Sequence, residues 1–233
     1  MSIETILKQN NIDDISCAKF KKYYDLLVEW NQKMNLTAIT EEDDVAVKHF
    51  LDSLCADIPE IVFRGANVID VGTGAGFPGI PIKIVRPDIH ITLLDSLGKR
   101  INFLSEVVSS VELENVNCVH MRAEDGGRDK KYREKFDVCL SRAVANLSTL
   151  SELCLPFLKS GGYFISLKGP KASEEIESAK NAVKILGGEI IECRKCNISD
   201  YEYEHYAVII KKISQTPTKY PRKAPKPSKE PLA

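Results

Sequence analysis

Four glycines within eight positions make residues Val68 to Pro81, VIDVGTGAGFPGIP, the most restrictive stretch of the sequence. An apolar run precedes the glycines, and an apolar pattern with helical spacing follows them. This order predicts a strand, a tight turn and a helix, and such a turn brings backbone N–H groups close to a ligand. Gly74 to Gly79 fit the dinucleotide pattern G-x-G-x-x-G, but S-adenosylmethionine (AdoMet) sites use a similar turn. The glycines alone leave the ligand open.

Short apolar runs alternate with segments of helical spacing after residue 65. The expected strands are 67–71, 90–95, 116–121, 136–141 and 163–167, and the expected helices are 80–85, 99–108, 147–158 and 174–186. Such alternation predicts a parallel, doubly wound α/β sheet. Two final runs, 189–196 and 205–213, are joined by a loop too short for a crossover helix, so we expect an antiparallel hairpin. This is the Rossmann-like layout of class I AdoMet-dependent methyltransferases.

The chain divides into three predicted parts. Residues 1–60 form a helical extension, because Phe20, Tyr23, Leu27, Trp30 and Met34 recur at helical spacing. Residues 61–213 form the AdoMet-binding Rossmann-like domain. Residues 214–233, SQTPTKYPRKAPKPSKEPLA, contain five prolines, five basic residues and one acid, so we expect an extended or disordered tail. That tail could solubilise the protein or make a weak contact with phosphate.

The overall composition is that of a cytoplasmic protein. The net charge is −1, so a polyanion must be met by local patches, and no apolar run approaches the 18 residues of a membrane span. No secretory signal is present, and the seven cysteines fit buried, reduced thiols. Cys193 and Cys196 form a lone C-x-x-C without partners at zinc spacing. We therefore expect no metal, membrane or DNA partner, and a monomer.

Carboxylates at three strand ends discriminate between the possible ligands. Asp70, two residues before the first glycine, suits a cationic ligand group and would repel a pyrophosphate, although it could instead brace the turn. Asp95, at the next strand end, suits ribose hydroxyls in either ligand class. Ala123 and Glu124, after the third strand, suit an adenine face and its amine. The combination favours AdoMet over NAD.

The absence of two sequence motifs narrows the choice of the atom that accepts the methyl group. The segment after the fourth strand reads Ser141-Arg142-Ala143, without the Asn/Asp-Pro-Pro-aromatic motif of exocyclic-amine methyltransferases. No Pro-Cys or Thr-Cys dipeptide supplies the nucleophile of a pyrimidine-C5 enzyme. A ring nitrogen with its own lone pair, such as guanine N7, remains. Its methylation needs no general base, so positioning supplies the acceleration and no catalytic acid or base is expected.

Four basic residues are expected at the same sheet edge as the glycine turn. Lys99 and Arg100 follow the second strand, Arg142 follows the fourth and Lys168 follows the fifth. This placement favours a phosphate-binding rim over scattered surface charge.

The sequence resembles the bacterial small-subunit (16S) ribosomal RNA guanine-N7 methyltransferase family RsmG, also called GidB. The matching stretches are WNQKMNLTAI, HFLDS, VIDVGTGAGFPGIPIKIVRPD, TLLDSLGKRINFL, Ala123-Glu124, Ser141–Ala143 and LKG at Leu167–Gly169. The resemblance covers roughly residues 1–213.

The resemblance implies transfer of the AdoMet methyl group to N7 of one guanine in 16S ribosomal RNA of the small subunit, leaving S-adenosylhomocysteine. It implies cofactor contacts at Gly72, Phe77, Ala123, Glu124 and Arg142, beside the Asp70, Gly74 and Asp95 named above. Lys99, Arg100 and Lys168 are then the candidates for RNA contacts. His49, within HFLDS, is expected to be a buried structural histidine, and no chemistry is assigned to Asp52. The rival hypothesis is a protein that senses NAD or AdoMet without turnover.

Overall fold

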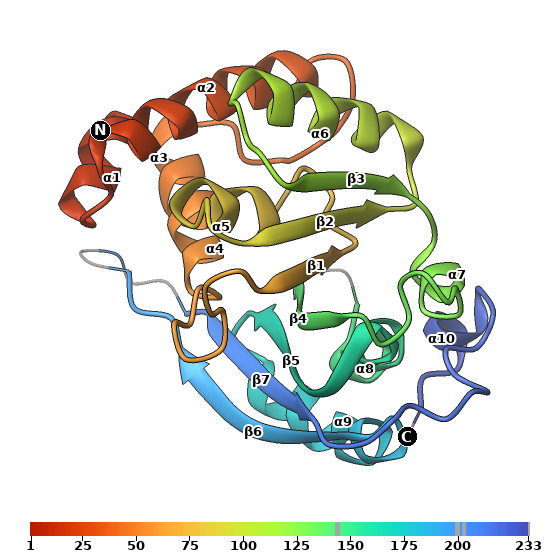
Figure 1. Cartoon of the computed structure of the whole chain (residues 1–233). Helices are drawn as coiled ribbons and strands as arrows, with labels where there is room; N and C mark the ends of the chain where they lie inside the picture. Colours follow the sequence, from red (N-terminus) through yellow and green to blue (C-terminus); the bar gives the residue numbers. More distant parts are fainter. Residues whose placement is uncertain (143–144, 199–200, 202–203, 233) are drawn as a thin grey trace.

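The computed structural model describes residues 1–142, 145–198, 201 and 204–232, and its centre is a seven-stranded sheet (Figure 1). The strand order is β3-β2-β1-β4-β5-β7-β6, and β7 runs antiparallel to both of its neighbours, β5 and β6. The strands are β1 (Asn67–Val71), β2 (His90–Asp95), β3 (Val116–His120), β4 (Phe136–Arg142), β5 (Leu158–Lys168), β6 (Gly188–Lys195) and β7 (Tyr206–Lys212). The predicted doubly wound sheet with its C-terminal antiparallel hairpin is confirmed.

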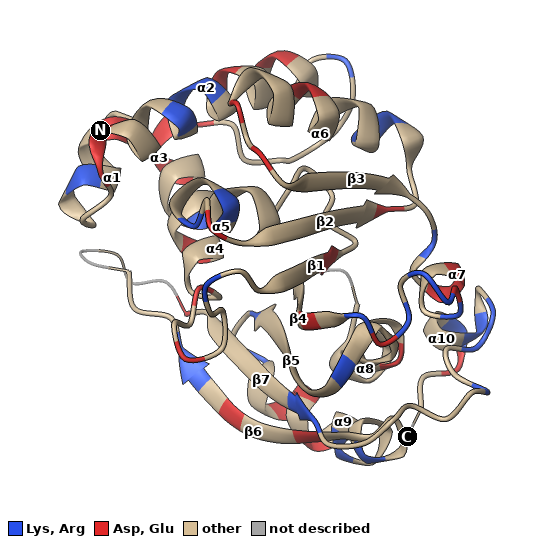
Figure 2. Ribbon diagram, in the orientation of Figure 1, with Lys and Arg blue, Asp and Glu red and all other residues tan. Residues whose placement is uncertain are grey.

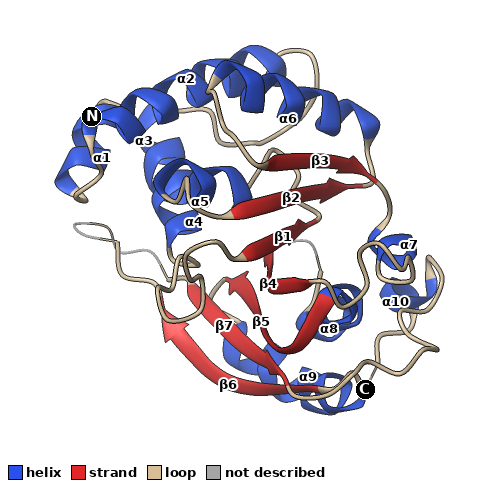
Figure 3. Cartoon of the chain, viewed as in Figure 1, coloured by secondary structure: helices blue, strands red, loops and turns tan. Residues whose placement is uncertain are grey.

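Helices cover both faces of the sheet (Figure 3). One face carries α5 (Gly79–Val85), α6 (Gly98–Ser110) and the N-terminal helices. The other face carries α8 (Leu147–Cys154) with the short turn η2 (Leu155–Phe157), and α9 (Ala172–Ile185). Two short helices, α7 (Ala123–Gly126) and α10 (Lys226–Lys229), lie on the side toward which β2 and β3 point (Figure 1). Among the described helices, none is long and apolar enough to cross a membrane.

The predicted N-terminal helical extension packs directly onto the glycine turn. It consists of α1 (Ile3–Gln9), α2 (Asp14–Asn31), α3 (Glu42–Val45), the π-helical stretch η1 (Ala46–Leu51) and α4 (Asp52–Leu54). Tyr23 on α2 is fully buried, and its hydroxyl donates a hydrogen bond to the carbonyl of Ala75. A side chain at Gly76 would meet the Tyr23 hydroxyl at 2.8 Å. The glycine at position 76 therefore lets the extension reach the turn.

Asp70 holds the glycine turn together from inside. Its Oδ2 accepts hydrogen bonds from Thr73 Oγ1 (2.7 Å) and from the N–H of Gly79 (2.9 Å), the first residue of α5. The carboxyl group is completely buried, and Oδ1 has no partner among the residues described. Burial raises the pKa of Asp70 to about 7, against hydrogen bonds that lower it. The brace role considered from the sequence is thus present in the structure.

The tail differs from the prediction. Residues 214–232 are not a free extended segment, because they pack against α8 and the chain that follows α7. Arg222 forms a two-pronged ion pair with the buried Glu152 of α8, at 2.6 Å from Nη2 to Oε2. Arg133 donates to the carbonyls of Thr216 and Tyr220. The proline-rich composition hid these contacts, since their partners lie roughly 70 to 90 residues earlier in the chain.

Replacing the tail's ionic anchor should lower stability. In Arg222→Met the fully buried carboxylate of Glu152 loses its cation, and the free energy of unfolding should fall by about 3 kcal/mol. Urea denaturation measures the loss, and hydrogen exchange of residues 214–232 reports release of the tail. The double variant Glu152→Gln, Arg222→Met should recover much of that loss. Equal stability of Arg222→Met and wild type would contradict the anchoring role.

The buried carboxyl of Asp70 should give the protein a distinctive pH dependence. Between its ordinary pKa of 3.8 and the folded value of about 7, the folded state holds a proton that the unfolded state has released. Asp70 therefore destabilises the fold increasingly as pH rises through this window. Relative to wild type, Asp70→Asn should gain up to about 4 kcal/mol between pH 4 and 8, measured by urea denaturation. Glu177→Gln, at an exposed carboxylate on α9, is the control, and a pH-independent difference for Asp70→Asn would refute the assignment.

Candidate active site

A cavity of about 470 Å³ opens at the carboxyl edge of the sheet, between the glycine turn, the end of β2 and the start of α7. Seven of the eight residues predicted as cofactor contacts line it: Gly72, Gly74, Phe77, Asp95, Ala123, Glu124 and Arg142. Asp70 is the exception, because its carboxyl group lies behind the turn and braces it. The structure thus brings three strand ends and one turn to a single hollow.

Asp95 connects the floor of the cavity to the glycine turn. Its Oδ2 accepts from the N–H of Gly74 at 3.0 Å and from Arg100 Nη1 at 3.3 Å, while Oδ1 accepts from the N–H of Leu97 at 2.9 Å. The side chain is 3% exposed, and it is fixed in one orientation by these donors. A carboxylate has about four lone-pair sites, so Asp95 Oδ1 can still accept one hydrogen bond from a hydroxyl group in the cavity.

Glu124 brings a second carboxylate to the cavity wall. It lies in α7 directly after Ala123, and it is 9% exposed. Its side chain makes no hydrogen bond or ion pair with the described part of the chain. A largely buried carboxylate without a protein partner is costly, and a ligand that donates hydrogen bonds would offset that cost.

Arg142, at the end of β4, closes the cavity on the side of the N-terminal extension. Its Nη1 lies 2.9 Å from Asp52 Oδ2 and 3.1 Å from the carbonyl of Lys48, and its guanidinium lies 4.7 Å from the ring centre of Phe77. Asp52 is fully buried at the start of α4. The next residue, Ala143, lies outside the described residues.

His49 is buried, as expected from the sequence, and it also lines the cavity. Its ring lies 4.5 Å from that of Phe77, and its Nε2 is hydrogen-bonded to Thr37 Oγ1 at 2.8 Å. Burial, and then the charge of Arg142, lower the pKa of His49 to about 4. The imidazole is therefore neutral at physiological pH, and it packs and orients its neighbours without adding charge.

Asp52 also contacts the C-terminal hairpin. His205, just before β7, places Nδ1 at 2.5 Å from Asp52 Oδ1, so one carboxylate joins α4, β4 and the hairpin. His205 lines a second hollow of about 690 Å³, together with Asn146, Lys168 and Leu232. Sequence reasoning left Asp52 without a role and overlooked His205. The spacing of His49 and Asp52 in HFLDS, which puts both on one side of a helix, was the available signal.

The predicted basic rim is only partly present. Lys99 is exposed at the start of α6, and Arg100 lines the cavity. Lys168, predicted to contact RNA, is instead 4% exposed. Its ammonium donates to Glu175 Oε2 at 2.7 Å and to the carbonyl of Ala145 at 2.6 Å. The nearby acid therefore neutralises Lys168, and its charge holds β5 to α9 rather than facing solvent.

A thiol-containing cluster lies behind Asp52. One ligand-type atom each of Asp52, Cys55 and Cys196 lies within 4.8 Å of the others. The two oxygens of Asp52 already accept from Arg142 and His205. The two cysteines hydrogen-bond to each other, which together with burial raises the pKa of Cys55. The Cys55 thiol therefore stays protonated, beside a carboxylate that is already paired.

The comparisons with known proteins agree on one family. The family model described as rRNA small subunit methyltransferase G, GidB, matches residues 16–203. A "Ribosomal RNA small subunit methyltransferase G" from Alkaliphilus oremlandii is 54% identical, over 100% of both chains. One from Desulforamulus reducens is 55% identical, over 92% of this chain and 89% of its own.

Solved structures support the fold. The structure titled M. jannaschii TYW2 in complex with AdoMet aligns with a TM-score of 0.54 at 18% identity, over 74% of this chain and 76% of its own. At that identity the likeness speaks for the fold alone. The match of the family model over most of the chain, with relatives above 50% identity along most or all of their length, decides the family. The chain belongs to the rRNA small subunit methyltransferase G (GidB) family.

Proposed function

We propose that this protein transfers the methyl group of AdoMet to N7 of a guanine in 16S ribosomal RNA of the small subunit. The observation that carries the proposal is the cavity at the carboxyl edge, where the glycine turn, Asp95 and Glu124 converge in a chain of this methyltransferase family. In doubly wound sheets ligands bind outside the carboxyl ends of the strands, where this cavity lies.

The residues present fit AdoMet. Glu124 supplies a largely buried carboxylate that has no partner among the described residues, which suits the donors of an adenosine. Asp95 suits the ribose hydroxyls, and Gly72 and Gly74 let the backbone approach the amino-acid part. The volume of about 470 Å³ lies in the ordinary range for small-ligand sites. The carboxyl group of Asp70 lies behind the turn and outside the cavity, and its Oδ1 has no partner among the described residues; the positive charge of AdoMet in the cavity favours the ionised form of this group.

When bound, AdoMet supplies a methyl group on a positively charged sulfur. Guanine N7 attacks through a lone pair and has no proton to lose, so the protein's task is to align donor and acceptor. Phe77 and Arg142 form a rigid wall, because the guanidinium stacks on the ring and is fixed by Asp52. The neutral His49 packs against the same ring.

Lys99 and Arg100, at the start of α6, contact substrate phosphate, whereas the paired Lys168 does not.

The direct test is methyl transfer. Incubation of the protein with labelled AdoMet and small ribosomal subunits that lack the modification should label the RNA, and nucleoside analysis should identify N7-methylguanosine. A different methylated nucleoside would refute the acceptor atom. If AdoMet raises the melting temperature but no RNA is labelled, the protein is a sensor and the proposed reaction is wrong.

Removing either carboxylate from the cavity should weaken AdoMet binding. Asp95→Asn and Glu124→Gln each lose charge-assisted hydrogen bonds, so the dissociation constant measured by calorimetry should rise about 10- to 100-fold. The control, Glu177→Gln on α9, removes an exposed carboxylate outside the cavity and should bind like wild type. Unchanged affinity in both cavity variants would place AdoMet elsewhere.

A further inference from the structure

The docked tail presents a row of lysines that the site described above does not use. Lys219, Lys223, Lys226 and Lys229 are all exposed, and we refer to them as the tail face. The acidic side chain among residues 214–232 is Glu230, which lies 3.7 Å from Lys226 in an exposed ion pair. Exposed pairs of this kind are weak, so the tail face keeps a strong positive charge although the whole chain carries −1.

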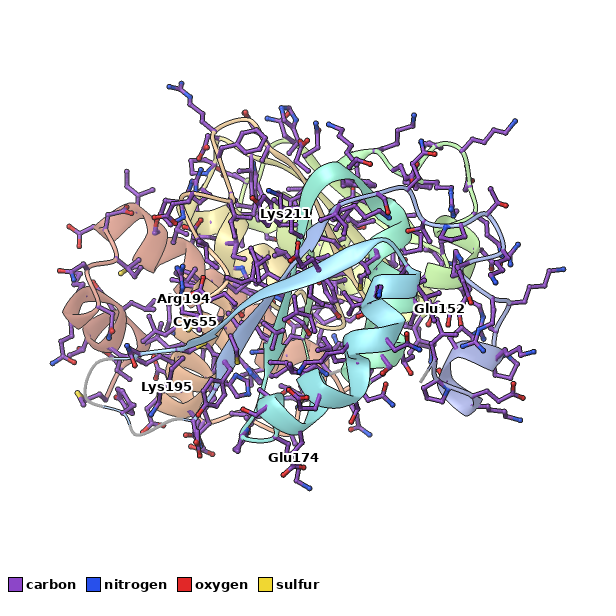
Figure 4. All side chains as sticks on the ribbon, turned by 90° about the horizontal axis from the view of Figure 1, so that it is seen from below. Cys55, Glu152, Glu174, Arg194, Lys195 and Lys211 are labelled. Carbon is purple, nitrogen blue, oxygen red and sulfur yellow. The ribbon has the colours of Figure 1, made fainter. Side chains whose placement is uncertain are left out.

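Buried contacts hold the tail face in place. Arg222, in the middle of the row, reaches inward to Glu152, which lies on the tail side of the molecule in Figure 4. Arg133 and Arg128 donate to tail carbonyls at Tyr220 and Pro221, at 2.8 and 2.7 Å. A backbone fixed in this way leaves only the lysine side chains to be ordered when a ligand binds, which lowers the entropic cost of binding.

The tail runs along the edge of the sheet that holds the cavity. A side chain at Gly127, directly after α7, would meet Pro221 Cγ at 2.9 Å, so the tail passes closely over the helix that carries Glu124. Farther along, Thr149 near the start of α8 donates to the carbonyl of Pro227 at 3.1 Å. Pro231 and Leu232, farther along the tail, line the second hollow. The tail thereby connects the margins of the two hollows.

Further basic side chains extend the tail face. Arg122 lines the first cavity, and Arg128, Lys130 and Lys131 follow α7. Figure 2 shows Lys and Arg along α10 and along the neighbouring loop after α7. Asp125 and Asp129 are also exposed there and reduce the net charge, but the lysines of the tail have no such neighbours in sequence except Glu230. The charge is thus concentrated beside the cavity.

We propose that the tail face is a binding surface for the phosphate backbone of RNA, which it holds beside the nucleotide to be methylated. The proposal rests on the proposed function, since it assumes that the substrate is RNA. A spaced row of ammonium groups matches a polyanion, and it carries no groups arranged to read base edges. The tail face therefore contributes affinity and orientation, while selection of the base belongs to the cavity.

The test removes the lysine charges of the tail face and leaves the buried contacts that hold the tail in place unchanged. The quadruple variant Lys219→Gln, Lys223→Gln, Lys226→Gln, Lys229→Gln is compared with a control that carries Lys→Gln at the exposed Lys8, Lys22, Lys180 and Lys184 of α1, α2 and α9. Affinity for deproteinised small-subunit RNA is measured by fluorescence titration from 50 to 300 mM salt. The tail variant should bind about 10- to 100-fold more weakly at low salt, and its slope of log affinity against log salt should be smaller by about 3. AdoMet affinity should match that of wild type.

The other outcomes each decide the proposal. Lys→Arg at the same four tail positions keeps the charge and should keep RNA affinity. A Lys→Gln tail variant with the affinity and salt slope of the control would overturn the proposal. A loss confined to assembled small subunits, with naked RNA bound normally, would assign the tail face to an acidic ribosomal protein and reject RNA. Wild-type protein that binds AdoMet but not RNA would refute the proposed function as well, which separates the two failures.

Discussion

The ion pair of Asp52 with Arg142 and its hydrogen bond with His205 connect the parts of the molecule that build the cavity. This fully buried carboxylate accepts from Arg142 at the end of β4 and from His205 before β7, and it belongs itself to the N-terminal extension. A buried carboxylate without partners is expensive, and removing one partner of such a pair typically costs about 3 to 5 kcal/mol. The three segments are therefore coupled, because each supplies a group that the others need. Phe77 depends on the same coupling, since Arg142 and His49 pack on its ring.

The same device recurs at two other buried charged side chains, Lys168 and Glu152. Lys168 is matched by Glu175, and Glu152 is matched by Arg222. Each pair joins segments that secondary structure alone would leave independent: β5 with α9, and α8 with the tail. Burial makes such pairs sensitive to loss of one partner rather than strong contributors to stability. They are best understood as devices that fix which segments lie together around the carboxyl edge of the sheet.

Helices and strands could be predicted from the sequence, because their signal lies in neighbouring residues. Contacts between residues far apart in the chain could not. The bounds of β1 and β2 match the apolar runs at 67–71 and 90–95, because both strands are buried between helix layers and read as continuous apolar segments. The residues Asp95, Glu124 and Arg142 could be expected at one edge of the sheet, because parallel strands bring their carboxyl ends together there. Lys168 was also placed at a strand end, but its side chain is paired with Glu175 seven residues later. The docking of the tail depends on Glu152, Arg128 and Arg133, which no local pattern connects to a proline-rich segment.

Asp70 and Asp95 show how two carboxylates at neighbouring strand ends can serve different purposes. Asp70 faces inward and shapes the turn through Gly79 and Thr73, with a pKa raised to about 7 by burial. Asp95 faces the cavity and is held by Gly74 and Arg100. A pyrophosphate seated on this turn would lie close to both carboxyl groups, and its charge would oppose the ionised form of each. The positive charges of a ligand with a cationic sulfur and an ammonium group would instead be attracted by these carboxylates. Such a ligand makes ionisation of Asp70 favourable. The same glycine turn that fits a dinucleotide pattern is therefore electrostatically suited to a cationic methyl donor.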